Sequence, residues 1–205
     1  LFFIILTFFP VFLSEKLDYL SRKQNHQGVV AQLSNIDYWE LEELFEHIDA
    51  TGENAFLVYL DNVTDVRNLG AIARSAECAG ANGLIIPQQG SAPINQDAIK
   101  TSAGALLRLP VCKINNIKTF INTIKAHDVR IYSASEKANV LYTQMKATEP
   151  LMLVMGSEEN GVSPTMIKMS DELVKIPLKG EIESLNVSAA ASVLLFEIVR
   201  QRLGI

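Results

Sequence analysis

Apolar and polar positions alternate in a regular way from Ala55 to the end of the chain. Short apolar runs, rich in β-branched and aromatic residues, are separated by longer segments in which apolar residues recur with helical spacing. The runs that predict strands are 55–61, 83–88, 109–114, 130–135, 150–157 and 172–178. The segments that predict helices are 70–79, 97–106, 117–126, 165–169 and 188–202. Near-continuous apolar strands joined by crossover helices predict an α/β domain with a mainly parallel sheet and helices on both faces.

The chain before Ala55 has a different pattern. Residues 37–48 have the spacing of an amphipathic helix, and a turn follows it. Residues 1–13 are strongly apolar but too short to span a bilayer, and no basic region precedes them, so we expect neither a membrane anchor nor a signal peptide. We therefore expect an N-terminal segment and linker over residues 1–50, and one domain over residues 51–205.

The amino-acid composition and net charge limit the kind of protein that this sequence can encode. The 205 residues are 48% hydrophobic and 20% charged, as in a globular domain, and the formal net charge is −5. This charge argues against a protein coated in basic residues, although a local basic patch stays open. Cys78 and Cys112 lack the spacing of a disulfide framework, so we expect both to be small buried residues in a protein of the reducing cytoplasm. The histidines are scattered without ligand spacing, and we expect no metal.

Polar loops follow three of the predicted strands. They are "DNVTDVRNLG" at 61–70, "GSEENGVS" at 156–163 and "KGEIESLNVS" at 179–188. Because ligands of open parallel sheets bind beyond the carboxyl ends of the strands, these loops are the candidate site. The sequence contains neither the dinucleotide fingerprint nor the phosphate-binding loop, which argues against a nicotinamide or nucleoside triphosphate site.

The same loops carry a resemblance to a known family. "DVRNLGAIARSA", "MGSEENGVS" and "IPLKGEIESLNVSAAASVLLFEIVRQR", in this order, resemble the motifs of the SpoU/TrmH family of RNA 2'-O-ribose methyltransferases over residues 55–202. The resemblance implies a SPOUT fold with a C-terminal trefoil knot, a homodimer, and S-adenosylmethionine bound by the backbone of the knot loops. Knots are rare exceptions to the rules of chain connection, so the hydrophobic pattern alone does not predict one.

Matching positions in the first two motifs give four implied site residues. Asn68 orients the site from the loop, and Arg74, in the helix that follows, points toward the substrate ribose and its phosphate. Because an arginine normally stays protonated, we expect Arg74 to clamp the phosphate and polarise the 2'-hydroxyl, with the proton leaving to the phosphate or another acceptor. Gly156 matches a position where backbone approaches the cofactor closely. Glu158 matches the family glutamate, which could pair with Arg74 or hold the loop.

The third motif implies the remaining site residues. Ser184 and Asn186 match the family's serine and asparagine, and both are also good N-cap types, so capping explains part of this motif without any chemistry. Ile176 and Leu185 match positions where the family backbone holds the adenosine portion of the cofactor. The first motif departs from the family at Val66, where proline is common, and this departure implies a less rigid loop.

The implied reaction is an in-line transfer of the sulfonium methyl group to a ribose 2'-oxygen, for which positioning supplies most of the rate and no metal is needed. "KLDYLSRKQNHQGVVAQL" at 16–33 further resembles the linker of the RlmB branch, which modifies a guanosine of 23S ribosomal RNA. The L30e-like RNA-binding domain found upstream in that branch is expected to be truncated here. Two alternatives stay open: a transfer-RNA ribose methyltransferase, and a catalytically silent RNA-binding or ribosome-assembly factor of the same fold. The basic residues expected to contact RNA are Arg67, Arg74, Lys100 and Arg108.

Overall fold

The computed structural model describes residues 17–19, 21 and 36–205. The chain divides into two compact units, Leu1–Ser34 and Asn35–Ile205. The apolar stretch at 1–13 and most of the linker at 16–33 lie outside the described residues, so the fold below is that of the second unit. No helix within the described ranges is long and apolar enough to cross a membrane.

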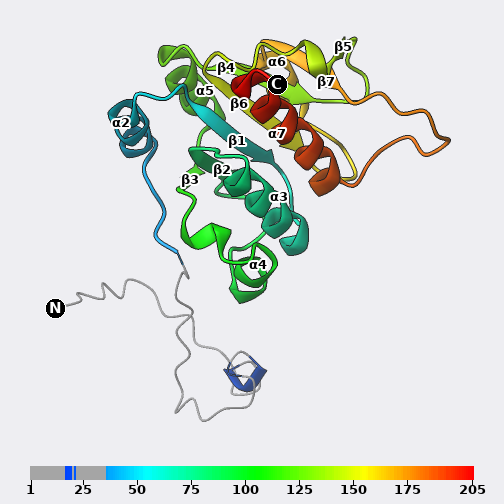
Figure 1. The fold of residues 1–205 in the computed structure, drawn as a ribbon. Coiled ribbons are helices and arrows are strands. Elements are labelled where there is room, and N and C mark those ends of the chain that lie inside the picture. The colour runs from blue at the N-terminus through cyan, green and yellow to red at the C-terminus, as the bar shows by residue number, and fades with distance from the viewer. Residues whose placement is uncertain (1–16, 20, 22–35) are drawn as a thin grey trace. The chain divides into compact units, whose positions relative to one another are not determined.

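Seven strands of the described chain form one parallel sheet, with the order β3-β2-β1-β6-β4-β7-β5 (Figure 1). The strands are β1 (Phe56–Asp61), β2 (Gly83–Pro87), β3 (Val111–Ile114), β4 (Arg130–Ala134), β5 (Val140–Leu141), β6 (Leu151–Gly156) and β7 (Glu172–Lys175). The two central strands, β1 and β6, are buried along their whole length. Strands covered on both faces are continuously apolar, which is the pattern that the sequence shows.

Helices cover both faces of the sheet. They are α2 (Leu41–Thr51), α3 (Val66–Cys78), α4 (Gln96–Thr101), α5 (Ile117–Ala126), α6 (Pro164–Met169) and α7 (Val187–Leu203), with short 3-10 turns at Ala105–Leu107 and Tyr142–Gln144. Alternate residues of β1 divide between the two faces, because side chains along a strand point to opposite sides. Phe56 and Leu60 pack in a core with α3 and α7, whereas Leu57 and Tyr59 pack in a second core with α2, α5 and α6.

The predicted α/β fold with a parallel sheet and helices on both faces is confirmed, and four details differ. The predicted helix at 97–106 ends at Thr101, where Ala103 and Gly104 have positive φ angles. Strand β5 has only two residues and is too short to leave a periodic signal. The predicted helix at 37–48 lies at Leu41–Thr51, where it contributes Leu44 to the core. Cys78 is exposed, contrary to the expectation that both cysteines are buried. The trefoil knot stays a prediction.

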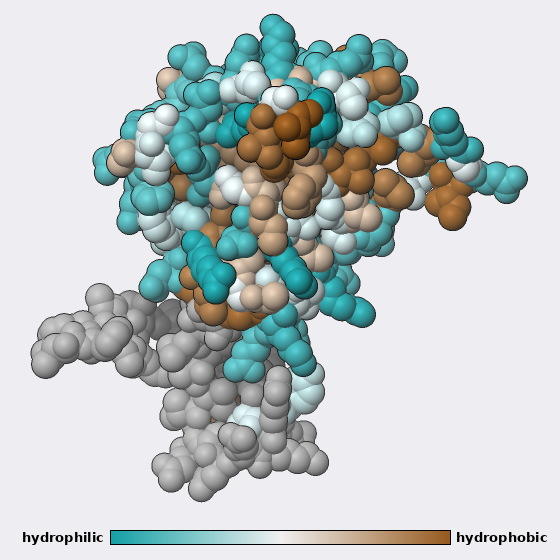
Figure 2. Space-filling model, viewed as in Figure 1, coloured by the Kyte–Doolittle hydropathy of each residue, from teal (hydrophilic) through white to brown (hydrophobic). Residues whose placement is uncertain are grey.

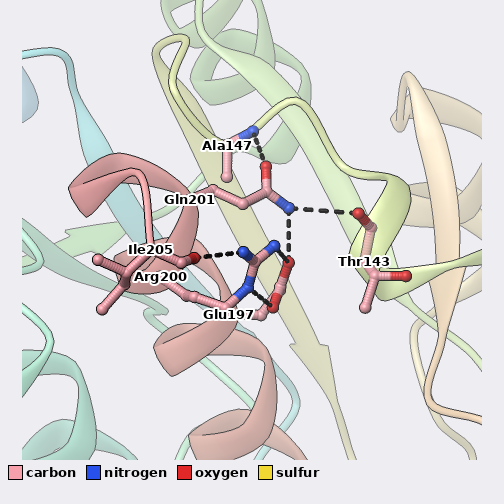
Figure 3. A network of polar contacts seen from close by, with 6 residues as sticks. All are labelled: Thr143, Ala147, Glu197, Arg200, Gln201 and Ile205. Atoms are coloured by element: carbon pink, nitrogen blue, oxygen red, sulfur yellow. Dashed lines mark hydrogen bonds and ion pairs between the residues drawn. The ribbon is translucent and has the colours of Figure 1, made fainter.

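A polar network fixes the C-terminal end of α7 (Figure 3). The Glu197 carboxylate accepts hydrogen bonds from Arg200 Nε and Nη2, both at 2.9 Å, and from Gln201 Nε2 at 2.8 Å. Gln201 Oε1 in turn accepts from the backbone N–H of Ala147 at 3.1 Å. The hydrogen bonds from Arg200 lower the pKa of Glu197.

Arg202 fixes the same end of α7 to the starts of the central strands. Its guanidinium donates to the backbone carbonyls of Ala147 and Asn54, each at 2.9 Å, to that of Ala55 at 3.0 Å, and to that of Glu149 at 3.3 Å. Burial lowers the pKa of Arg202 from its usual value, although the many carbonyl acceptors keep its charge solvated. Helix α7 is therefore anchored at the sheet edge opposite to the candidate site.

Candidate active site

The three polar loops begin at neighbouring carboxyl ends of the sheet. Strands β1 and β6 pair in register with Asp61 beside Gly156, so the loops that follow them start side by side. Strand β7 lies two positions from β6, on the far side of β4, and the segment after it leads to α7. The edge predicted from the rule for parallel sheets is therefore the edge at which the three motifs meet.

Asp65 determines where α3 begins. Its side chain accepts hydrogen bonds from the backbone N–H groups of Asn68, at 3.1 Å, and Arg67, at 2.7 Å, and these lower the pKa of Asp65. This N-cap brings Val66 into the first helical position, which a proline would suit, and the helix forms without one. The expectation that Asn68 acts from the loop is therefore wrong: Asn68 lies in the first turn of α3.

Three predicted residues form a hydrogen-bonded chain across the motifs. Asn186 Nδ2 donates to Asn68 Oδ1 at 3.1 Å, and Asn68 Nδ2 donates to Glu158 Oε1. We call Asn68, Glu158 and Asn186 the motif network. Asn186 is also the N-cap of α7, because its Oδ1 accepts from the backbone N–H of Ser188 at 2.9 Å. The N-cap role expected from the residue type is therefore present, and the same asparagine also joins two motifs.

Arg74 lies outside the motif network. It is exposed on α3, and its side chain points about 120° away from that of Asn68 around the helix axis, because the two residues are six positions apart. Within residues 36–205 the side chain of Arg74 takes part in no hydrogen bond or ion pair, and Glu158 contacts Asn68 instead. Of the two roles considered for Glu158, the structure has the one that holds the loop. The guanidinium of Arg74 is thus exposed and unpaired among the described residues.

A cavity of about 620 Å³ lies at the carboxyl edge of the sheet. Six of the eight predicted site residues line it: Gly156, Glu158, Ile176, Ser184, Leu185 and Asn186. Its walls combine apolar side chains, such as Val174 and Leu194, with charged groups at the rim. Asn68 and Arg74 lie outside the lining, and Asn68 reaches the cavity only through its two partners.

The cavity also has a wall that the motifs do not include, formed by the loop after β4, residues 134–137. The polar residues of this wall are Ser135, Glu136 and Lys137. Strand β4 lies between β6 and β7, so its loop necessarily opens between theirs. The sequence contained the strand but not its place in the sheet, and only the strand order could have identified this loop.

The backbone of Gly161 and Val162 packs directly against Gly156. A Cβ atom at this position would overlap the backbone atoms of Gly161 and Val162, which no small adjustment can relieve. Backbone hydrogen bonds close this turn, from Ser157 N–H to Gly161 O at 3.1 Å and from Gly161 N–H to Ser157 O at 3.0 Å. We call residues 156–163 the motif 2 loop. The glycine expected for close approach of a cofactor is therefore also required for the loop itself.

The model of the SpoU rRNA Methylase family matches residues 55–196. The chain belongs to the SpoU rRNA methylase family. Among the relatives is the 23S rRNA (guanosine-2'-O-)-methyltransferase RlmB of Xylella fastidiosa, which is 40% identical over 92% of this chain and 76% of its own. An uncharacterised tRNA/rRNA methyltransferase of Synechocystis is 38% identical over 91% of this chain. The chain spans only about half of that protein, 49% of its length.

Solved SpoU structures have the same fold. The SpoU methyltransferase AviRb from Streptomyces viridochromogenes, in complex with the cofactor AdoMet, aligns with a TM-score of 0.70 at 29% identity, over 74% of this chain and 59% of its own. The TrmH/SpoU tRNA modifying enzyme of A. aeolicus aligns with a TM-score of 0.67 at 28% identity, over 78% of this chain and 85% of its own. The seven-stranded parallel sheet is therefore that of the SpoU methyltransferases.

Proposed function

We propose that this protein transfers the methyl group of S-adenosylmethionine to a ribose 2'-hydroxyl of RNA, and that its substrate is a guanosine of 23S ribosomal RNA. The motif network carries the proposal, because Asn68, Glu158 and Asn186 come from three distant motifs and meet beside one cavity. Family membership and the RlmB relatives at about 40% identity support the reaction and the substrate.

The cavity suits S-adenosylmethionine. Its volume of about 620 Å³ is in the range of small-molecule sites, and its mixture of apolar walls and polar rim suits a nucleoside joined to an amino acid. Ile176 and Leu185 would hold the adenosine portion, and the motif 2 loop would close over the rest. The cofactor has no phosphate, so the absence of a glycine-rich phosphate loop from the sequence fits this ligand. When bound, it supplies an activated methyl group on a sulfonium.

The side chains of this protein would position the reactants. In the reaction the 2'-oxygen forms a bond to the methyl carbon, the bond from that carbon to sulfur breaks, and the hydroxyl proton leaves to the phosphate or another acceptor. Arg74 is unpaired within the described chain and would hold the RNA phosphate next to the reacting ribose. The motif network would fix the loops that face the ribose, since a small misplacement of reactants costs much of the rate.

Basic residues around Arg74 would bind the RNA backbone. Arg67 and Arg74 are seven residues apart on α3 and share a face, while Lys100 and Arg108 lie on neighbouring segments that pack against α3. Of these four residues only Arg108 has an ion pair within residues 36–205, with Glu77 at 3.8 Å. Unpaired cations can replace the counterions of RNA phosphates, so we expect the affinity for RNA to fall as the salt concentration rises.

We also propose that the protein is a homodimer, with α7 at the interface. Helix α7 buries one face, and its outer face carries three exposed apolar side chains, Val193, Phe196 and Leu203. Figure 2 shows apolar surface over this helix. Exposed apolar surface that gathers in one place marks an interaction site. Sedimentation velocity should show a dimer for the wild type and for Leu107→Glu, which changes an exposed leucine elsewhere, and a monomer for Phe196→Glu. A dimer of Phe196→Glu would exclude this interface.

We also propose a domain organisation, a cellular location and a knot for this protein. We propose that residues 1–50 link the methyltransferase domain, 51–205, to an L30e-like RNA-binding domain in the whole protein. Cytoplasmic location is proposed from the ribosomal RNA substrate and from the free cysteines, Cys78 and Cys112. The trefoil knot is proposed from membership of the family.

A methyl-transfer assay tests the proposed function. Tritiated S-adenosylmethionine is incubated with the protein and with either 23S ribosomal RNA lacking ribose methylation or bulk transfer RNA. We expect label in ribosomal RNA with the wild type and its loss with Arg74→Ala. The control variant Lys118→Ala should keep the activity, because it removes an exposed cation from α5, on the opposite face of the sheet from α3. Label in transfer RNA alone would favour the transfer-RNA enzyme. Cofactor binding without transfer to either RNA would favour a silent RNA-binding factor.

A further inference from the structure

Asp61 is a buried carboxylate that none of the steps above uses. It is the last residue of β1, and only 3% of its surface is exposed. Glu197, the other buried carboxylate within the described residues, is paired with Arg200, whereas Asp61 has no ion pair there. A buried charge is costly unless hydrogen bonds compensate it, so the partners of Asp61 indicate its role.

The two carboxylate oxygens of Asp61 accept hydrogen bonds from the backbone of Ser163 and from the side chain of Asn62. Oδ2 accepts from the backbone N–H of Ser163 at 2.6 Å, and Oδ1 accepts from Asn62 Nδ2 at 2.9 Å. The bond to Ser163 joins residues 102 positions apart, at the end of the motif 2 loop. The start of that loop, Gly156, lies beside Asp61 in the sheet. Asp61 therefore fixes the end of the loop relative to its start.

Two further contacts hold the motif 2 loop: Val162, which is buried, packs in the second core, and Glu158 accepts a hydrogen bond from Asn68. The backbone pair between Ser157 and Gly161 closes its turn but does not fix the turn to the sheet. The turn carries Glu158, Glu159 and Asn160, which are exposed and line the cavity. The Ser163 bond adds a polar anchor next to the apolar one at Val162, so its loss would loosen the turn and weaken the contact between Glu158 and Asn68.

We propose that Asp61 is a positioning residue, which holds the motif 2 loop in the position relative to the sheet that cofactor binding requires. It acts on the reaction through Ser163 and the loop, and touches neither reactant itself. The inference rests on the proposed function in one respect, namely that the cavity takes S-adenosylmethionine.

Three variants of the full chain test this role. Asp61→Ala removes the acceptor for Ser163 N–H, and Asp61→Asn keeps one acceptor oxygen while the exposed Asn62 amide can rotate to pair with the new NH₂ group. Ser163→Ala is the matched control, because it removes the side-chain cap of α6 at Met166 N–H but keeps the backbone N–H that Asp61 binds. Calorimetry measures the Kd of S-adenosylmethionine well below each melting temperature, and hydrogen exchange measures protection of residues 157–163.

We expect Asp61→Ala to raise the Kd for S-adenosylmethionine about tenfold and to speed exchange across the loop, because a charge-assisted hydrogen bond is lost. Asp61→Asn should recover most of the affinity, and Ser163→Ala should bind within about twofold of wild type. The KM for RNA should change little in all three. A merely structural role would lower the melting temperature of Asp61→Ala and leave its Kd unchanged, and that result would overturn the proposal.

Failure of the proposed function has a separate signature. If the wild type binds no S-adenosylmethionine, the proposed cofactor site is wrong. The positioning role of Asp61 is then tested by hydrogen exchange alone. Protection of residues 157–163 that is equal in Asp61→Ala and wild type would refute the positioning role. Faster exchange that Asp61→Asn reverses would support it.

Discussion

Replacing Asn186 by aspartate separates its two roles. The Oδ1 atom caps α7 by accepting from the backbone N–H groups of Ser188, at 2.9 Å, and Ala189, at 3.4 Å. The Nδ2 atom donates to Asn68 Oδ1 at 3.1 Å. Aspartate keeps the acceptor and loses the donor, whereas alanine loses both. If capping alone explains Asn186, Asn186→Asp should behave as the wild type.

The loss of the helix cap and the loss of the motif network should have effects of different size on stability and on methyl transfer. Aspartate and asparagine cap helices equally well, so Asn186→Asp should change the free energy of unfolding by less than about 0.5 kcal/mol, while Asn186→Ala should lower it by about 1 kcal/mol. The new carboxylate would face Asn68 Oδ1, and a flip of that amide would turn its oxygen toward Glu158. Either arrangement breaks the motif network, so we expect methyl transfer by Asn186→Asp to fall at least about tenfold.

Urea unfolding and single-turnover methyl transfer, measured on the same preparations, test this prediction. The expected pattern is an aspartate variant as stable as wild type but impaired in transfer, and an alanine variant impaired in both. A double-mutant cycle with Asn68→Ala should show coupling in the transfer rate. Full activity of Asn186→Asp would refute the reasoning and leave Asn186 as a helix cap alone.

Three further predictions concern the loop and the anchor of α7. Gly156→Ala should lower the free energy of unfolding by about 1–3 kcal/mol and weaken S-adenosylmethionine binding, because its Cβ overlaps the backbone of Gly161; normal urea unfolding and normal calorimetric affinity would contradict this. Arg202→Met should cost about 2–3 kcal/mol in urea unfolding, because several carbonyls lose a charged donor; a loss below about 0.5 kcal/mol would show that water replaces the guanidinium. The pKa of Glu197 is lowered, so its stabilisation is present above the ordinary value of 4.5 and is lost as the pH falls through the folded value. The difference in unfolding free energy between wild type and Glu197→Gln should therefore shrink below about pH 4.5, and a constant difference would show that its charge is irrelevant.

Local sequence predicts most of the fold because the parallel strands are buried on both faces. Each of the six predicted runs contains an observed strand, and α5 (Ile117–Ala126) has the predicted bounds. The misses have local causes. Helix α3 begins at Val66 because Asp65 caps it, whereas the apolar spacing predicts a helix only from residue 70. The Ala103 and Gly104 backbone, with positive φ, ends the predicted helix at 97–106 early.

The site is less predictable than the fold. The resemblance supplied Asn68, Glu158 and Asn186, but no pattern in the sequence shows that they bond to one another. The loop at 134–137 was missed because the order β6-β4-β7 differs from the order in the chain. Asp61 was passed over because a polar residue at the end of a strand resembles any other, and only burial distinguishes it.

The position of the transferred methyl group tests the central claim most directly. Ribosomal RNA that lacks ribose methylation is incubated with the protein and S-adenosylmethionine, hydrolysed with alkali, and analysed by mass spectrometry. A 2'-O-methyl group removes the hydroxyl that alkali needs to cleave the adjacent phosphodiester, so the account predicts a methylated dinucleotide that resists alkali and begins with guanosine. Methyl groups found only on bases, in mononucleotides released by alkali, would contradict the account.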